Sequence, residues 1–305
     1  SDLAVNPVKT KAVKLTDKKK QPQITLAAEN FEVQFDRQTG FMSKYMVGGK
    51  SLLGEGGSLK PNFWRAVTDN DMGAQSQKEL KAWRTPELNL RSISADKKAK
   101  TVTAVYDMPT VKSTLTLVYQ AEENGALTIT QQLKTTPGAK VSDMLRFGMV
   151  MNLPYNMDQC QWNGRGPVEN YSDRKLSQNV GIYKSSADKL FFPYVRPQET
   201  GTMSDLRWWN QTDEGGFGFR VESDKMFSAS ALHYDLLSLD EGEEKHQRHS
   251  QSVEKSKYTN LFIDLLQQGV GGVNSWDADG RARKGHRVEY KDYTFKFRLS
   301  PKTVY

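Results

Sequence analysis

The sequence predicts an all-β protein built as a large antiparallel β-sandwich. Short runs of alternating apolar and polar residues recur along the 305 residues, and turn-forming residues separate them. The 3.6-residue period of a helix is almost absent, and no alternation of strands with helices indicates a parallel sheet. The chain contains 13 Phe, 12 Tyr and 6 Trp. Because each aromatic side chain buries a large area, this polar chain can still fill the core of a sandwich.

The elements are expected in the following order. Residues 1–23 are expected to form a linker from a preceding domain, since Pro7, Pro22 and the run Lys18–Lys20 interrupt any apolar period. The sandwich then spans residues 24–305. Its strands are expected at Ile24–Ala28, Phe31–Phe35, Phe41–Val47, Thr101–Tyr106, Ser113–Tyr119, Ala126–Leu133, Gly216–Glu222, Phe227–Tyr234, Asn260–Leu266 and Val288–Leu299. One helix is expected at Ala74–Arg84.

Two turns support the antiparallel assignment. Residues 36–40 separate the second and third expected strands and end in a glycine. The dipeptide Asn124-Gly125 separates a later pair, and Asn-Gly between two alternating runs is a strong hairpin signal. These connections are short, so consecutive strands are expected to pair as hairpins.

Composition excludes several classes of protein. The net charge is +7, but the excess lies in residues 1–30 and 281–305, which favours solvated ends over a nucleic-acid groove. No run of about 18 apolar residues predicts a membrane span. The single cysteine, Cys160, rules out a disulfide framework and a cysteine zinc site. Because the four histidines are scattered, no metal site is expected. No targeting segment is recognisable, so the compartment stays unassigned.

The segment Gly164–Arg174 has the highest density of glycines and charges. It lacks the Gly-Lys-Ser/Thr ending of a phosphate loop. A tight turn braced by ion pairs is expected instead, because a planar guanidinium can hold a carboxylate through two hydrogen bonds. The expected pairs join Arg165 or Arg174 to Glu169 or Asp173.

Two further loops carry charged residues. Asp69 and Asp71, two positions apart, could bind a cation, but no EF-hand pattern follows. Asx-turns and a helix N-cap are the favoured roles. Between Pro193 and Pro197, the chain is expected to be extended. Glu199 follows, and it could act as an acid, although the sequence indicates no partner.

The segment Gly269–Trp276 is the most suggestive local feature. Three glycines in four residues let the backbone approach another surface closely. Asn274, Ser275 and Asp277 flank Trp276, and an indole among small polar groups suits sugar recognition. The alternative is a tryptophan folded back onto the core, and spacing does not decide between them. No nucleophile with a neighbouring base and no paired catalytic acids can be recognised.

Five stretches together resemble one family, the C-terminal small-chain, or fifth, domain of glycoside hydrolase family 2 β-galactosidases. They occur in the order of that family and span roughly residues 30–300. The stretches are Phe35–Phe41, Trp64–Asp71, Gly164–Arg174, Tyr194–Gly201 and Gly269–Trp276. The resemblance implies a supersandwich similar to galactose mutarotase.

The resemblance also implies a division of labour. In this family both catalytic glutamates, a magnesium ion and possibly a sodium ion belong to an upstream TIM-barrel domain, so no catalytic residue and no metal ligand is expected here. Trp276, with Asn274 and Ser275, matches the loop that binds the aglycone sugar of a galactoside such as lactose. Val273 stands where the family commonly has an acidic residue, which puts the aglycone preference in question.

The remaining motif residues are expected to brace loops and contacts, with no chemical step. They are Arg165, Glu169, Asp173, Arg174, Arg196 and Glu199. The implied partners are the upstream barrel and sandwich domains of the same chain, within a homo-oligomer. Two alternatives stay open. One is a stand-alone carbohydrate-binding module. The other is an aldose mutarotase-like enzyme using His233 or His249 with Glu199.

Overall fold

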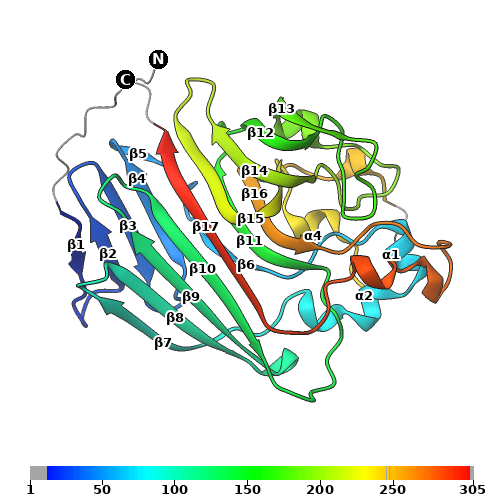
Figure 1. Cartoon of the computed structure of the whole chain (residues 1–305), viewed down its shortest axis with the longest axis horizontal. Helices are drawn as coiled ribbons and strands as arrows, with labels where there is room; N and C mark the ends of the chain where they lie inside the picture. Colours follow the sequence, from blue (N-terminus) through cyan, green and yellow to red (C-terminus); the bar gives the residue numbers. More distant parts are fainter. Residues whose placement is uncertain (1–11, 245, 247, 303–305) are drawn as a thin grey trace.

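The computed structural model describes residues 12–244, 246 and 248–302. Nearly all regular structure in this part of the chain is β-strand, and every paired strand runs antiparallel to its neighbours (Figure 1). None of the helices in these residues is long and apolar enough to cross a membrane. The predicted all-β fold class is confirmed.

One run of paired strands begins at the N-terminal side of the sheet. It passes through β1 to β4, continues through β6, β11, β16, β15, β14 and β12, and ends at β13. The bounds are β1 Lys14–Thr16, β2 Gln23–Ala27, β3 Phe31–Asp36, β4 Met42–Val47, β5 Lys50–Ser51, β6 Leu59–Asn62, β11 Arg146–Pro154, β12 Gln159–Gly166, β13 Asn179–Ser186, β14 Met203–Thr212, β15 Gly218–Leu232 and β16 Tyr258–Gln267. The short β5 forms a hairpin with β4.

A second run packs against the first. It consists of β7 Asn89–Asp96, β8 Thr101–Met108, β9 Ser113–Ala121, β10 Leu127–Thr135 and β17 Tyr293–Lys302, paired in that order. The first half of β15 pairs with β17 and its second half with β16, so this strand joins the two runs.

The core lies between the two runs. Alternate residues of β3 and β9 point inward and are fully buried. The rings of Phe35 on β3 and Tyr119 on β9 lie 4.7 Å apart. The Tyr45 hydroxyl donates to the Gly125 carbonyl at 2.6 Å. These contacts between segments distant in sequence show the face-to-face packing of a sandwich.

The N-terminal boundary differs from the expectation. Residues 1–11 of the expected linker lie outside the described residues. Within the remainder, β1 pairs with β2, and Val13 and Leu15 are buried in the core. The sheet therefore begins before residue 24, because these two apolar side chains alternate as a strand requires.

The single helix expected at Ala74–Arg84 is wrong. The chain forms α1 (Asp69–Gly73), α2 (Ser76–Glu79) and a 3₁₀ turn at Lys81–Trp83. Gln75 adopts a left-handed conformation with φ of 58°, which separates α1 from α2. The other short helices are α3 (Ala187–Leu190) and α4 (Leu236–Leu239). Helices α1 and α2 lie at the end of the molecule that also carries the loop before β17 (Figure 1).

Candidate functional site

Trp276 projects from the loop between β16 and β17. Its side chain is 77% exposed. The indole is therefore offered to solvent and is not folded back onto the core. The Asn274 carboxamide oxygen accepts the backbone N–H of Trp276 at 3.1 Å and that of Asp277 at 3.3 Å. The Asn274 amide also donates to Asp277 at 2.8 Å. These bonds form an Asx-turn that fixes the backbone at the tryptophan.

Asp173 anchors the start of this loop. Its two carboxylate oxygens accept the backbone N–H groups of Val270 at 3.0 Å and Gly271 at 2.9 Å. A Cβ atom on Gly269 would lie 2.2 Å from Asp173 Oδ2, so any other residue at that position would have to displace the anchoring carboxylate. The loop therefore rests on a carboxylate from the distant segment after β12.

A buried ion pair lies beneath the same loop. Arg65 and Asp71 are both nearly inaccessible, and the guanidinium donates to both carboxylate oxygens at 2.9–3.1 Å. Its remaining N–H groups donate to the carbonyls of Gln268 at 2.5 Å and Gly269 at 2.9 Å. Burial alone would lower the pKa of Arg65, but the adjacent Asp71 raises it above its usual value. The charged pair thus joins α1 to the loop.

Helix α1 contacts the loop along its length. Thr68 caps the helix and accepts the Asp71 N–H, while Asp71 accepts the Thr68 N–H in return. Asn70 donates to the Val270 carbonyl at 3.3 Å. At the end of the helix, a Cβ on Gly73 would lie 2.0 Å from the Ser275 carbonyl oxygen. The helix and the loop therefore pack with no gap.

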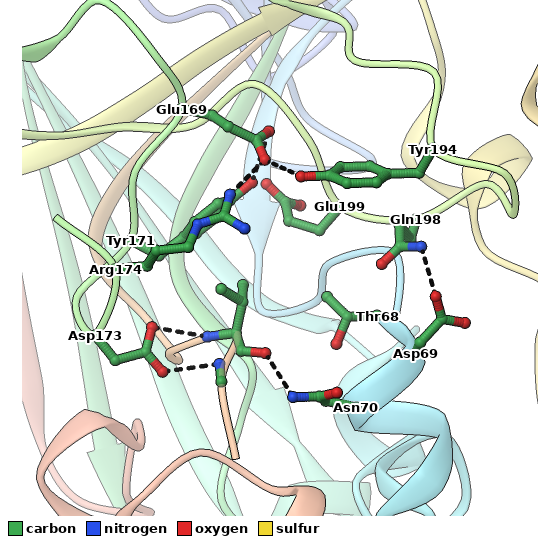
Figure 2. A pocket seen from close by; sticks show the side chains of 12 residues that line it. Thr68, Asp69, Asn70, Glu169, Tyr171, Asp173, Arg174, Tyr194, Gln198 and Glu199 are labelled. Atoms are coloured by element: carbon green, nitrogen blue, oxygen red, sulfur yellow. Dashed lines mark hydrogen bonds and ion pairs between the residues drawn. The ribbon is translucent and has the colours of Figure 1, made fainter. Parts of the chain in front are cut away.

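A pocket of about 440 Å³ opens beside the loop (Figure 2); we call it the loop pocket. Segments from four parts of the chain line it, and most of the lining residues carry polar side chains. The lining residues are Thr68, Asp69, Asn70, Glu169, Tyr171, Asp173, Arg174, Tyr194, Gln198, Glu199, Val270 and Gly271.

Glu169 is held on one wall of the loop pocket by several donors. Arg174 pairs with it at 2.5 Å, and the Tyr194 hydroxyl donates to the same carboxylate oxygen. The second oxygen accepts the Gly201 N–H at 2.7 Å and the Thr200 hydroxyl at 3.1 Å. Burial raises the pKa of Tyr194, and the hydrogen bond to Glu169 raises it further. The phenol therefore keeps its proton and remains a donor.

Glu199 is buried deeper and belongs to another ion pair. Arg146 donates to it at 3.2 Å, and Thr202 donates at 2.8 Å. Arg146 also lies 3.1 Å from Asp264. Burial raises the pKa of Asp264 to about 8, against the opposing effect of Arg146. The cost of burying this carboxyl therefore outweighs its attraction to Arg146.

The two other arginines of the expected network brace neighbouring loops. Arg165 donates to Asp205 at 2.6 Å, and Lys175 shares that carboxylate at 2.7 Å. Arg165 thus pairs with neither Glu169 nor Asp173. Arg196 donates to Asp69 at 2.8 Å, and it also reaches the Val67 carbonyl.

The sequence predicts some of these residues as members of one loop network and gives no indication of others. Four of the expected network residues, Glu169, Asp173, Arg174 and Glu199, line one pocket beside the Trp276 loop. The anchors Arg65, Arg146, Asp205 and Asp264 were not expected. Only Arg65 gave a signal, as an arginine inside an otherwise apolar stretch six residues before Asp71. The others are paired by the fold across long sequence separations.

Of the two histidines of the mutarotase alternative, His249 is exposed at the start of the 3₁₀ turn Ser250–Ser252, and His233 has partners other than Glu199. His233 is buried and stacks on Tyr155 with ring centroids 3.9 Å apart. Its Nε2 lies 3.8 Å from Asp158, whereas Glu199 pairs with Arg146. Within the described residues, no group of three or more His, Cys, Asp or Glu side chains is arranged to hold a metal ion.

The fold places the chain in the class of galactose mutarotase-like β-supersandwiches. Its structure resembles that of a galactose mutarotase related enzyme from Lactobacillus acidophilus, with a TM-score of 0.50 at 9% identity. The similarity covers 92% of this chain and 97% of that one. At this identity the comparison establishes the fold alone.

The sequence gives the family. The model of the β-galactosidase small chain matches residues 27–299, and the chain belongs to that family. It is 29% identical over 302 residues to a β-galactosidase of Priestia megaterium, covering 98% of this chain and 28% of that protein. It is 31% identical over 258 residues to a β-galactosidase of Lactobacillus delbrueckii subsp. bulgaricus, covering 82% of this chain and 24% of the relative. The chain thus spans about a quarter of these relatives.

Proposed function

We propose that this chain completes the active-site mouth of a β-galactosidase and that Trp276 binds the aglycone sugar of terminal β-D-galactosides such as lactose. One observation carries the proposal. A large aromatic side chain is 77% exposed on a loop that Asp173 and the buried Arg65–Asp71 pair hold rigidly. Exposing an indole forgoes its burial energy, so a rigid support for it favours a binding role.

The physical basis of binding would be stacking. The flat indole face would cover the C–H face of a pyranose while neighbouring polar groups bond its hydroxyls. Ser275 is exposed and can offer its hydroxyl. The Asn274 side chain is already bonded within the loop, so we assign it the role of orienting Trp276. Val273, 70% exposed, offers no polar group at the edge of the subsite.

The reactive carboxyls of the enzyme would lie in the upstream part of the parent chain. A retaining glycosidase needs two carboxyl groups about 5–5.5 Å apart. The pocket carboxylates Glu169, Asp173 and Glu199 each accept several hydrogen bonds, which suits bracing better than proton transfer. The barrel and sandwich domains, the magnesium and sodium ions, and the homo-oligomeric assembly implied by the resemblance belong to this same proposal.

The experiment separates the chain from its upstream part. The purified chain, incubated with lactose and with an aryl β-galactoside, is expected to release no galactose above buffer. Adding the separately produced upstream part is expected to raise hydrolysis above that part alone, because the aglycone wall is then restored. Hydrolysis of either substrate by the purified chain would refute the assignment of the acids to the upstream part.

A further inference from the structure

A second pocket, of about 610 Å³, shares no residue with the loop pocket. We call it the sheet pocket. Its floor is formed by β6, β11 and β16, which lie side by side (Figure 1). Its walls are residues 84–88, which follow α2, and the start of α4. The volume falls within the range of small-molecule sites.

The floor presents alternate residues of three strands to the pocket. In the strand register Lys60 lies opposite Val150, which lies opposite Phe262. In the next row, Asn152 lies opposite Asn260 and donates to it at 2.8 Å. The first row on the floor is therefore mixed in polarity, and the second consists of two carboxamides. The side chains of both rows lie on the same face of the sheet.

One buried polar group on this floor lacks a partner. Asn62 is 6% exposed and lines the sheet pocket. Its carboxamide oxygen accepts the Trp64 N–H at 3.2 Å, but its Nδ2 has no acceptor among the described residues. An unsatisfied amide is costly when buried, and a pocket ligand with an acceptor would remove that cost.

The charges and the apolar walls define the chemistry of the ligand. Lys60 and Asp235 oppose one another in sign, and Arg84 pairs with Asp240 at 2.6 Å, so the lining favours a neutral ligand. Carboxamides both donate and accept, as hydroxyl groups do. Leu236, Leu237, Pro86 and Leu88 offer an apolar wall for a C–H face.

We infer that the sheet pocket binds a hexopyranose, a second saccharide site on this chain that is independent of the Trp276 loop. The sugar would rest its apolar face on the wall near α4. Its hydroxyls would accept from Asn62 and Lys60 and exchange hydrogen bonds with Asn152. The inference does not depend on the proposed role of Trp276, because the two sites have no residue in common.

The test is calorimetric titration of the chain with D-galactose and with D-glucose. At least one sugar is expected to bind with a dissociation constant in the millimolar range. Lys60→Met removes an exposed donor and is expected to weaken binding about three- to tenfold, the usual effect of one hydrogen bond. Asn62→Leu is expected to weaken it tenfold or more, because the substituted side chain also fills part of the pocket.

One variant controls for effects outside the pocket. Lys97→Met removes an exposed lysine from the turn after β7 and is expected to leave sugar binding unchanged. Far-UV circular dichroism establishes that each variant is folded. Should Asn62→Leu fail to fold, Lys60→Met decides. No binding of either sugar, or binding unaffected by Lys60→Met, overturns the inference.

Discussion

Asp173 and Val270 are 97 residues apart in the sequence, yet the Asp173 carboxylate accepts the Val270 backbone N–H at 3.0 Å. The second carboxylate oxygen accepts the next N–H, that of Gly271. The loop that carries Trp276 is thus held by a side chain from a different part of the sandwich. Its position depends on this contact as much as on its own sequence.

Replacing Asp173 is expected to release the loop. In Asp173→Asn one acceptor oxygen becomes an NH₂ group, which cannot accept a backbone N–H. The loss of one charge-assisted bond should cost about 1.5–3 kcal/mol of local stability. Hydrogen exchange at the Val270 and Gly271 amides is expected to accelerate, and lactose hydrolysis by the parent enzyme should weaken. Unchanged exchange at both amides would contradict the role of Asp173 as an anchor.

Two glycines provide a steric version of the same test. A Cβ on Gly269 would meet Asp173 Oδ2 at 2.2 Å, whereas a Cβ on Gly271 would meet the same atom at 3.4 Å, an ordinary contact. Gly269→Ala is therefore expected to reproduce the Asp173→Asn phenotype, and Gly271→Ala is expected to leave exchange rates near those of the unmodified chain. Equal effects of the two substitutions would show that the crowding at Asp173 is not decisive.

The Arg65–Asp71 pair is expected to be essential for stability. Arg65→Met leaves the Asp71 carboxylate buried with its main partner removed, which should cost about 3–5 kcal/mol of unfolding free energy. Chemical denaturation measures this loss. Arg91→Met is the matched control, since Arg91 pairs with Asp107 at the surface, and an exposed pair contributes little. A loss no larger than that of the control would contradict the account of the buried pair.

Asp264 predicts a pH dependence of stability with a defined sign. Burial raises the pKa of this carboxyl from 3.8 to about 8, so the folded chain holds a proton that the unfolded chain releases. Stability is then greatest below the unfolded value and falls as the pH rises from about 4 to about 8. Relative to Asp264→Asn, the unmodified chain should lose up to about 1.4 kcal/mol per pH unit in this window.

An acidic residue with the opposite shift is the control for this measurement. Hydrogen bonds from Lys134 and Thr135 lower the pKa of Asp292 to about 2. Its contribution is present above the unfolded pKa and is lost only as the pH falls through the folded value. Asp292→Asn should therefore leave the slope between about pH 5 and 8 unchanged. A flat difference between Asp264→Asn and the unmodified chain would show that Asp264 is ionised in the folded state.

The sequence predicted strands where one face is buried and the other is solvated. The strands β3, β8 and β9 lie where alternation placed them. By contrast, β11 is buried on both faces over most of its length, so it has no alternation to read. Strand β7 is largely exposed. Its apolar residues Leu90, Ile93 and Ala95 pack against the core, but a register shift between Leu90 and Ser92 interrupts their alternation. The two strands expected around residues 223–226 are one, because β15 continues through these exposed residues.

In the candidate site, too, some residues can be recognised from the sequence and others only from the fold. The Trp276 loop was found because its glycines, asparagine and tryptophan are adjacent in the sequence. The anchors were not found because each pair is formed by distant segments, as in Arg146 with Glu199, 53 residues apart. Arg165 pairs with Asp205, and not with the acids nearer to it in the sequence, because β12 and β14 are paired. Local sequence patterns cannot reveal such ion pairs, because they depend on which strands are neighbours.

The role of Trp276 as the aglycone wall is tested most directly by the kinetics of Trp276→Ala in the parent enzyme, with lactose and an aryl β-galactoside compared side by side. Removal of the stacking face should cost about 1–2 kcal/mol, which is a loss of about five- to thirtyfold in apparent lactose affinity. The aryl galactoside should be affected less, because its chemically activated leaving group depends less on that wall. Lactose kinetics equal to those of the unmodified enzyme would contradict the account and remove Trp276 from the substrate site.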